Sequence, residues 1–225
     1  MSVIIQIKQL IYQWPKQAQP TLNIDYLSIE QGEHVFIKGV SGSGKTTLLN
    51  LLAGVLIPNQ GELVILNQSL NTLSNSQRDQ FRADHIGVIF QQFNLLPYLS
   101  VVDNVTLPCY FSKRRNQLVN NKKNTAQRLL TELGLKPNQF KSAVTELSVG
   151  QQQRVAVARA LIGHPELIIA DEPTSALDAE TRNDFLQLLF QEAQQQNSTI
   201  LFVSHDPSIS THFERVIDLA DLNRA

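Results

Sequence analysis

Two groups of residues in this chain have the types and spacing needed to bind and hydrolyse a phosphate chain. The first is Gly39-Val40-Ser41-Gly42-Ser43-Gly44-Lys45-Thr46, which lies between an apolar run and a helical run. Its glycines allow positive φ, so successive N–H groups and the following helix N-terminus point at an anion. Lys45 then reaches the β- and γ-phosphates, and Thr46 holds Mg²⁺. The predicted nucleotide contacts are Gly39, Ser41, Gly42, Ser43, Gly44, Lys45, Thr46 and Thr47.

The second group is a pair of acids, Asp171 and Glu172, which follows the apolar run Leu167-Ile168-Ile169-Ala170. The carboxyl end of a buried strand is where α/β sheets place their ligands. We expect Asp171 to bind Mg²⁺ and Glu172 to polarise or deprotonate the water that attacks the γ-phosphate. The alternative is an acid pair that caps a helix before Pro173, and the preceding phosphate loop disfavours it.

An α/β fold must position these groups, because short β-branched runs alternate with helical stretches along the chain. Nearly continuous apolar runs indicate strands buried on both faces of a mainly parallel sheet, as in a P-loop NTPase core. The predicted core strands are Val35 to Ile37, Ile86 to Phe90, Leu167 to Ala170, Ile200 to Ser204 and Val216 to Leu219. An N-terminal antiparallel β-subdomain is predicted at Val3 to Leu10, Tyr26 to Ile29 and Gly61 to Leu66.

Between residues 91 and 166 the pattern becomes mostly helical, which predicts an inserted α-helical subdomain. One helix is expected from Thr125 to Leu133 before Gly134, and another from Gly150 to Ile162 before Gly163, because glycine commonly caps a helix C-terminus. We therefore expect a single domain, residues 1–225, with a nucleotide-binding core at 1–90 and 165–225 and a helical subdomain at 92–164. The glutamines at 151–153 are expected on a solvated helix face.

Composition limits the partners of this site. The 225 residues carry a formal net charge of -1, which gives no general polyanion-binding signal, so no nucleic-acid partner is expected. The chain has one cysteine, Cys109, and the sequence shows neither a long apolar run nor a signal-peptide pattern at Met1. We expect a soluble chain whose membrane link comes through a partner. A basic cluster within residues 113–123 is expected to be a solvated loop.

In the order of its segments the chain resembles the ATP-binding subunits of ABC transporters. Leu147-Ser148-Val149-Gly150-Gln151 is similar to the signature usually written LSGGQ. The resemblance implies that Ser148, Val149, Gly150 and Gln151 contact the γ-phosphate held by an opposite subunit. Ser148 also suits a helix N-cap, which is compatible with that role. Val149 replaces a glycine, and its branched side chain requires an ordinary backbone conformation there.

The resemblance also implies roles for single residues in other segments. Gln91 matches the glutamine of the Q-loop, which touches Mg²⁺ or water, and Asp178 matches the D-loop at the dimer seam. His205, after a predicted strand, matches the switch histidine that contacts the γ-phosphate. The family stacks an early aromatic ring on adenine, and Trp14 is favoured over Tyr12, the two rings being expected on opposite faces of a strand end.

These resemblances imply an ATPase that needs ATP and Mg²⁺, forms an ATP-sandwich homodimer and drives a separate membrane permease. The segments at 81–97 and 103–108 resemble the lipoprotein-release and macrolide-export (LolD/MacB-like) subgroup, which favours export, extraction or mechanotransmission. The implied partner is an FtsX/MacB-like permease, with a further periplasmic partner in some systems, at the cytoplasmic face of the inner membrane. Two alternatives stay open, a regulatory cell-envelope or cell-division ATPase that moves no cargo and a soluble ABC ATPase.

Overall fold

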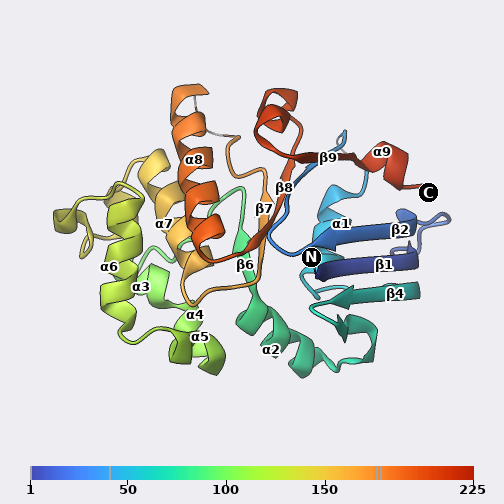
Figure 1. Cartoon of the computed structure of the whole chain (residues 1–225), viewed down its shortest axis with the longest axis horizontal. Helices are drawn as coiled ribbons and strands as arrows, with labels where there is room; N and C mark the ends of the chain where they lie inside the picture. Colours follow the sequence, from blue (N-terminus) through green and yellow to red (C-terminus); the bar gives the residue numbers. More distant parts are fainter. Residues whose placement is uncertain (1, 41, 176, 178) are drawn as a thin grey trace. The chain divides into compact units, whose positions relative to one another are not determined.

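The structure, a computed structural model, describes residues 2–40, 42–175, 177 and 179–225, with the side chains of 179–181 excluded. Two predicted site residues, Ser41 and Asp178, therefore lie outside the described residues. The chain forms two compact units (Figure 1), which we call the first unit (Met1–Arg82 with Thr199–Ala225) and the second unit (Ala83–Ser198).

The first unit contains a four-stranded sheet in the order β2-β1-β4-β5. Its strands, paired antiparallel, are β1 (Val3–Tyr12), β2 (Leu22–Glu30), β4 (Gln60–Ile65) and β5 (Gln68–Ser69). Ile7 of β1 lies opposite Leu27 on one side and Leu63 on the other, and all three are buried. The predicted antiparallel β-subdomain is confirmed. β2 begins four residues earlier than expected, because Asn23 and Asp25 interrupt an apolar run whose Leu22 and Ile24 are buried.

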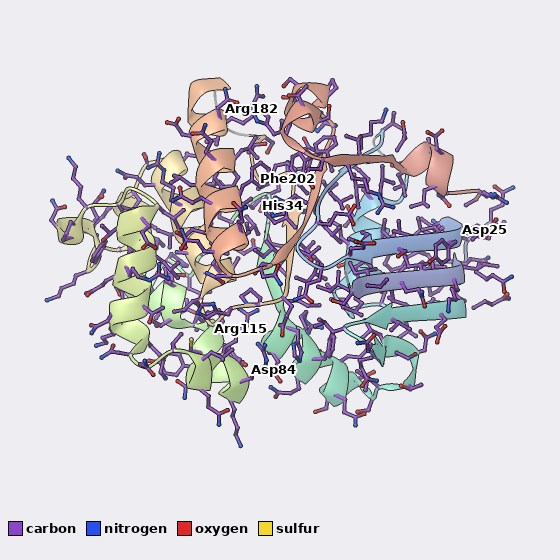
Figure 2. All side chains as sticks on the ribbon, viewed as in Figure 1. Asp25, His34, Asp84, Arg115, Arg182 and Phe202 are labelled. Atoms are coloured by element: carbon purple, nitrogen blue, oxygen red, sulfur yellow. The ribbon has the colours of Figure 1, made fainter. Side chains whose placement is uncertain are left out.

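The first unit also contains three parallel strands. β3 (His34–Lys38) pairs with β8 (Thr199–Ser204) on one side and β9 (Arg215–Asp218) on the other. Phe36 lies opposite Phe202 (labelled in Figure 2), with ring centroids 6.2 Å apart, and Phe213 packs on both rings. This aromatic core fixes the strands whose carboxyl ends carry the phosphate loop and His205. The helices are α1 (Lys45–Leu52), α9 (Leu219–Leu222) and 3₁₀ turns at Leu70–Thr72 and Pro207–His212.

In the second unit, β6 (Ile86–Ile89) and β7 (Leu167–Asp171) form a parallel pair with Ile86 opposite Leu167. α2 (Asn75–His85), whose residues 75–82 belong to the first unit, leads along the chain into β6. The remaining helices are α3 (Val101–Thr106), α4 (Pro108–Phe111), α5 (Lys113–Leu118), α6 (Lys122–Glu132), α7 (Val149–Leu161) and α8 (Ala179–Gln195), with 3₁₀ turns at Pro137–Gln139 and Val144–Glu146.

The two helices predicted from the sequence of this region end close to their glycines. Gly134, after α6, has φ 79°, and Gly163, after α7, has φ 76°. Both lie in the left-handed region, where glycine carries no steric penalty. Within the described ranges, no helix is both long and apolar enough to span a bilayer.

Candidate functional site

The phosphate loop joins β3 to α1, and its backbone depends on glycine. Gly42 and Gly44 have φ values of 81° and 96°. A Cβ on Gly44 would lie 2.8 Å from Leu22 Cδ2 and 3.2 Å from the Thr21 carbonyl oxygen. Glycine therefore lets α1 begin directly after the turn, with its N-terminal amides pointing along the helix axis toward the loop.

Two polar side chains of the loop are arranged to meet an anion. Lys45 Nζ donates to the carbonyl oxygens of Gly39 at 2.6 Å and Val40 at 3.0 Å, which holds the ammonium over the loop. The Ser43 hydroxyl is buried and lacks a hydrogen-bond partner in the part of the chain that the structure describes. A buried hydroxyl of this kind ordinarily has a partner. Together with a cation and a helix N-terminus, it fits a phosphate group.

The two aromatic candidates for adenine stacking differ in exposure. Tyr12, the last residue of β1, is 6% exposed, whereas Trp14 is 36% exposed. Their rings meet edge to face with centroids 5.2 Å apart, and Trp14 Nε1 donates to Thr47 Oγ1 at 3.4 Å. The expectation of opposite faces is therefore wrong, because residues two apart near a strand end point to the same side. The indole lies within reach of α1, and Tyr12 supports it from the core.

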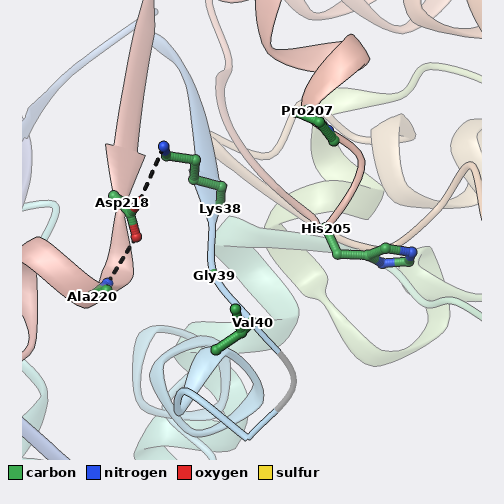
Figure 3. A pocket seen from close by; sticks show the side chains of 7 residues that line it. All are labelled: Lys38, Gly39, Val40, His205, Pro207, Asp218 and Ala220. Carbon is green, nitrogen blue, oxygen red and sulfur yellow. Dashed lines mark hydrogen bonds and ion pairs between the residues drawn. The ribbon is translucent and has the colours of Figure 1, made fainter.

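His205 follows β8 and lines a cavity of about 300 Å³ together with Gly39 and Val40 of the phosphate loop (Figure 3). Lys38 and Asp218 line the same cavity, and their side chains form an ion pair at 3.0 Å. The Ala220 N–H and then the Lys38 ammonium hold the pKa of Asp218 below its usual value. The first unit thus places the predicted switch histidine beside the phosphate loop.

In the second unit, Gln91 is exposed just after β6, and the backbone beyond it is held by α7. Phe93 and Asn94 have φ values of 57° and 48°, an unusual conformation for residues with side chains. Arg159 of α7 donates to both of their carbonyl oxygens, at 2.7 Å for Asn94. Arg159 was not predicted from the sequence, and it connects the segment after Gln91 to the helix of the signature.

The signature residues form the N-terminus of α7. Ser148 Oγ accepts from Gln151 N–H at 3.3 Å, and Gln151 Oε1 accepts from Ser148 N–H at 3.0 Å. This capping box fixes the first turn of α7. Val149 is helical, as its branched side chain requires, and 51% exposed, while Gly150 follows it in the first turn. The N-cap role of Ser148 is confirmed.

The acid pair lies at the end of β7. Asp171 is the last residue of the strand, and Glu172 has φ 46°. A side-chain-bearing residue in the left-handed region carries strain, which commonly marks a functional position. Gln153 of α7 is 1% exposed and donates from Nε2 to the Pro173 carbonyl oxygen at 2.6 Å. The solvated face expected at 151–153 is therefore wrong for Gln153, which shares the buried side of α7 with residues 156, 157 and 160.

Comparison with known proteins identifies the family. Residues 22–175 match the family model described as ABC transporter. This chain belongs to the ABC transporter family. An uncharacterised ABC transporter ATP-binding protein of Methanocaldococcus jannaschii, MJ0796, is 40% identical over 195 residues, or 87% of this chain and 83% of that protein. The macrolide export ATP-binding/permease protein MacB of Psychrobacter cryohalolentis is 39% identical over 97% of this chain. The chain spans 32% of the length of that MacB protein.

Solved structures confirm the fold of this ATP-binding cassette. A dimeric MJ0796 cassette in a post-hydrolysis state, bound to ADP and Pi, matches with a TM-score of 0.84 and 34% identity, covering 96% of this chain and 94% of that chain. CbiO1 of Clostridium perfringens, from the ABC transporter complex cbiONQ, matches with a TM-score of 0.83 at 24% identity, which supports the fold alone. The predicted resemblance and the predicted fold class are confirmed.

Proposed function

We propose that this cassette binds ATP with Mg²⁺ and hydrolyses the γ-phosphate. The observation that carries the proposal is the phosphate loop, where Lys45 and the Ser43 hydroxyl, buried without a partner among the described residues, meet the start of α1. Trp14, exposed beside α1, stacks on the adenine ring. The dimeric cassette bound to ADP and Pi, 34% identical, supports the choice of an adenine nucleotide.

The donor set of the predicted metal site fits Mg²⁺. The Thr46 hydroxyl, the Gln91 amide and the Asp171 carboxylate are oxygen ligands, which this hard cation prefers. In the part of the chain that is described, no three His, Cys, Asp or Glu residues gather into a metal site of their own. Mg²⁺ commonly takes one or two carboxylates together with substrate phosphates. When bound, it neutralises charge on the phosphate oxygens.

The remaining site residues act on water and on the γ-phosphate. Glu172, at the strained end of β7, is the general base that orients the attacking water. Gln91 contacts that water or the metal, and His205, which lines the cavity beside the phosphate loop, contacts the γ-phosphate. Each role is carried over from the family to the residue that matches its motif.

We further propose that two copies of the chain enclose two ATP molecules. Lys45 and Thr46 of one copy hold a nucleotide whose γ-phosphate is contacted by Ser148 and Gly150 of the other. The capped N-terminus of α7 supports this second contact, because helix N-termini favour anions. Hydrolysis removes the bridging phosphate and opens the dimer, so chemical energy becomes movement of the two copies.

The movement drives a membrane permease in this proposal. The relatives named MacB are export ATP-binding/permease proteins, and this chain spans 32% of the first. We propose that an FtsX/MacB-like permease on another chain receives the movement at the cytoplasmic face of the inner membrane. The movement serves export, extraction or mechanotransmission, and some systems include a periplasmic partner. The comparisons name transport proteins, so a regulatory or purely soluble ATPase is not favoured.

The test is affinity purification of the tagged Glu172→Gln chain with ATP from detergent-solubilised membranes. This variant should hold ATP without hydrolysing it and thereby keep the permease bound. A Lys45→Ala chain, which should bind nucleotide weakly, is the matched control. Recovery of a permease with a large extracytoplasmic domain, by Glu172→Gln only, supports the proposal. Recovery of soluble or ribosomal proteins alone would overturn the transport part and leave the ATPase part standing.

A further inference from the structure

The basic cluster at 113–123 does not behave as the solvated loop expected from the sequence, because one of its arginines is buried. Arg115 of α5 is 1% exposed, whereas Lys113 of the same helix is exposed. The backbone around Arg115 is fixed by the Ser112 hydroxyl, which accepts from the Arg115 N–H at 2.9 Å. The second unit therefore places a guanidinium inside its core (Figure 2).

The guanidinium of Arg115 donates to backbone carbonyl oxygens. Nε donates to Asp84 at 3.4 Å, at the end of α2. Nη1 donates to Ala160 at 3.4 Å and to Ile162 at 3.3 Å, at the C-terminal end of α7. The last carbonyls of a helix have no partner within the helix, so Arg115 satisfies groups that α7 leaves open.

The backbone of α7 is closely packed at this end. A Cβ on Gly87 of β6 would lie 2.4 Å from the Ala160 carbonyl oxygen, and a Cβ on Gly163 would lie 2.5 Å from Arg115 Cβ. β6 and α5 thus confine the C-terminal end of α7 from close range. Arg115 supplies the hydrogen bonds in this arrangement.

Stability alone is a poor explanation for this residue. Burial lowers the pKa of Arg115 to about 10, which reports the cost of removing the cation from water. Its Nη2 is buried without a partner in the described part of the chain. Whole buried ion pairs can often be replaced by apolar residues with little loss of stability, and buried polar groups are retained in some proteins because they specify one arrangement of the chain.

We propose that Arg115 is a positioning residue that anchors the C-terminal end of α7 and thereby sets the place of Ser148 at its other end. α7 has 13 residues, so it is about 20 Å long at 1.5 Å per residue. A tilt of about 3° at the anchored end moves the other end by about 1 Å on that length. A misplacement of about 1 Å can lower the rate of a reaction about 100-fold when the reacting groups must be aligned. This inference rests on the proposed ATP-sandwich dimer.

The test compares three variants of the full chain in the Glu172→Gln background. Arg115→Met removes the anchor. Lys113→Met makes the same substitution at an exposed position of α5. Glu166→Gln disturbs the neighbouring ion pairs of Glu166 with Arg114 and His85 and leaves the Arg115 guanidinium in place. Dimerisation with Mg-ATP is measured by analytical ultracentrifugation, and nucleotide binding by the monomer is measured at low protein concentration.

We expect Arg115→Met to weaken ATP-dependent dimerisation about 10- to 100-fold, between the loss of one hydrogen bond to a charged group and the cost of a misplacement of about 1 Å. Monomer nucleotide affinity stays within about twofold, because the phosphate loop lies in the first unit. When Arg115→Met is made in a chain that keeps Glu172, kcat for ATP hydrolysis falls. The ATP concentration that half-occupies the monomer does not change. Both control variants dimerise like the unmodified background. If Arg115→Met does not fold, Arg115→Lys is used, which keeps the charge and loses the fork of donors.

Dimerisation of the Arg115 variant at the background affinity overturns the inference, as does equal weakening by Glu166→Gln, which would show a general loss of stability. The proposed function fails in a different way. A Glu172→Gln chain that stays monomeric in Mg-ATP overturns the sandwich dimer itself, whatever residue stands at 115.

Discussion

Ser148 has two roles in this account, and two substitutions separate them. Its Oγ accepts from Gln151 N–H at 3.3 Å as the N-cap of α7, and it contacts the partner's γ-phosphate in the proposed dimer. Aspartate caps helices as well as serine does, so Ser148→Asp should keep the cap and bring a negative charge to the phosphate. Ser148→Ala should lose the cap and bring no charge.

The two substitutions are expected to differ measurably in their effects on Tm and on the affinity of the dimer. Loss of the cap in Ser148→Ala costs about 1 kcal/mol, which lowers the Tm of a chain of this size by about 2–4 °C. A carboxylate about 4 Å from one unit of phosphate charge is repelled by about 4 kcal/mol at an effective dielectric of about 20, or about 1,000-fold in affinity. Ser148→Ala loses one hydrogen bond to a charged group, about 1.5–3 kcal/mol or about 10- to 100-fold.

Thermal denaturation of the monomer reports the cap, and ultracentrifugation of the Glu172→Gln background with Mg-ATP reports the dimer. We expect Ser148→Asp to keep its Tm within about 1 °C and to lose the dimer. We expect Ser148→Ala to have a lower Tm and to form a dimer of lower affinity. The reasoning is refuted if Ser148→Asp dimerises as well as Ser148→Ala, because the phosphate contact would then be absent.

Three further predictions concern single side chains. Lys45→Ala should weaken Mg-ATP binding at least tenfold in equilibrium dialysis, since it removes charge-assisted hydrogen bonds, and unchanged binding would contradict the loop assignment. Trp14→Leu should weaken ATP binding about 5- to 100-fold by loss of stacking, while Tyr12→Phe, a change in the core, should not. Burial raises the pKa of Glu166, but the His85 hydrogen bond and the His85 and Arg114 charges hold it below 4.5. The ionised Glu166 therefore stabilises the fold above about pH 4.5, and this contribution is lost as pH falls through the lower pKa of the folded state. The difference in the free energy of unfolding by urea between wild type and Glu166→Gln should accordingly shrink below about pH 4.5.

The strands were predictable because burial leaves a direct mark on sequence. The central residues of β3, β7 and β8, at 35–37, 167–170 and 200–203, are apolar and buried, as expected for strands covered on both faces. Gly134 and Gly163 marked helix ends because both adopt the left-handed conformation in which glycine commonly ends a helix. β2 was predicted too short, since polar residues on its open face interrupted the apolar run.

Polar residues buried by tertiary contacts were not predictable in the same way. Arg115 and Gln153 lie in polar stretches, and sequence alone does not say which side of a short helix faces inward. Gln153 precedes the buried positions 156 and 157 of α7 by three and four residues, and this helical spacing could have predicted its burial. α5 is too short for its sequence to show such a period. The sequence favoured Trp14 over Tyr12 for stacking, and the greater exposure of Trp14 agrees with that preference. The roles of the site residues remain predictions, because they rest on matches to the motifs of the family.

The central claim is that ATP closes two copies of this chain and that Glu172 opens them by hydrolysis. The most direct measurement is the mass of the Glu172→Gln chain in solution, by light scattering, with no nucleotide, with Mg-ADP and with Mg-ATP. We expect a monomer in the first two conditions and a stable dimer with two bound ATP in the third, together with loss of hydrolysis. A chain that remains monomeric in Mg-ATP, or that hydrolyses ATP at the wild-type rate, contradicts the central claim.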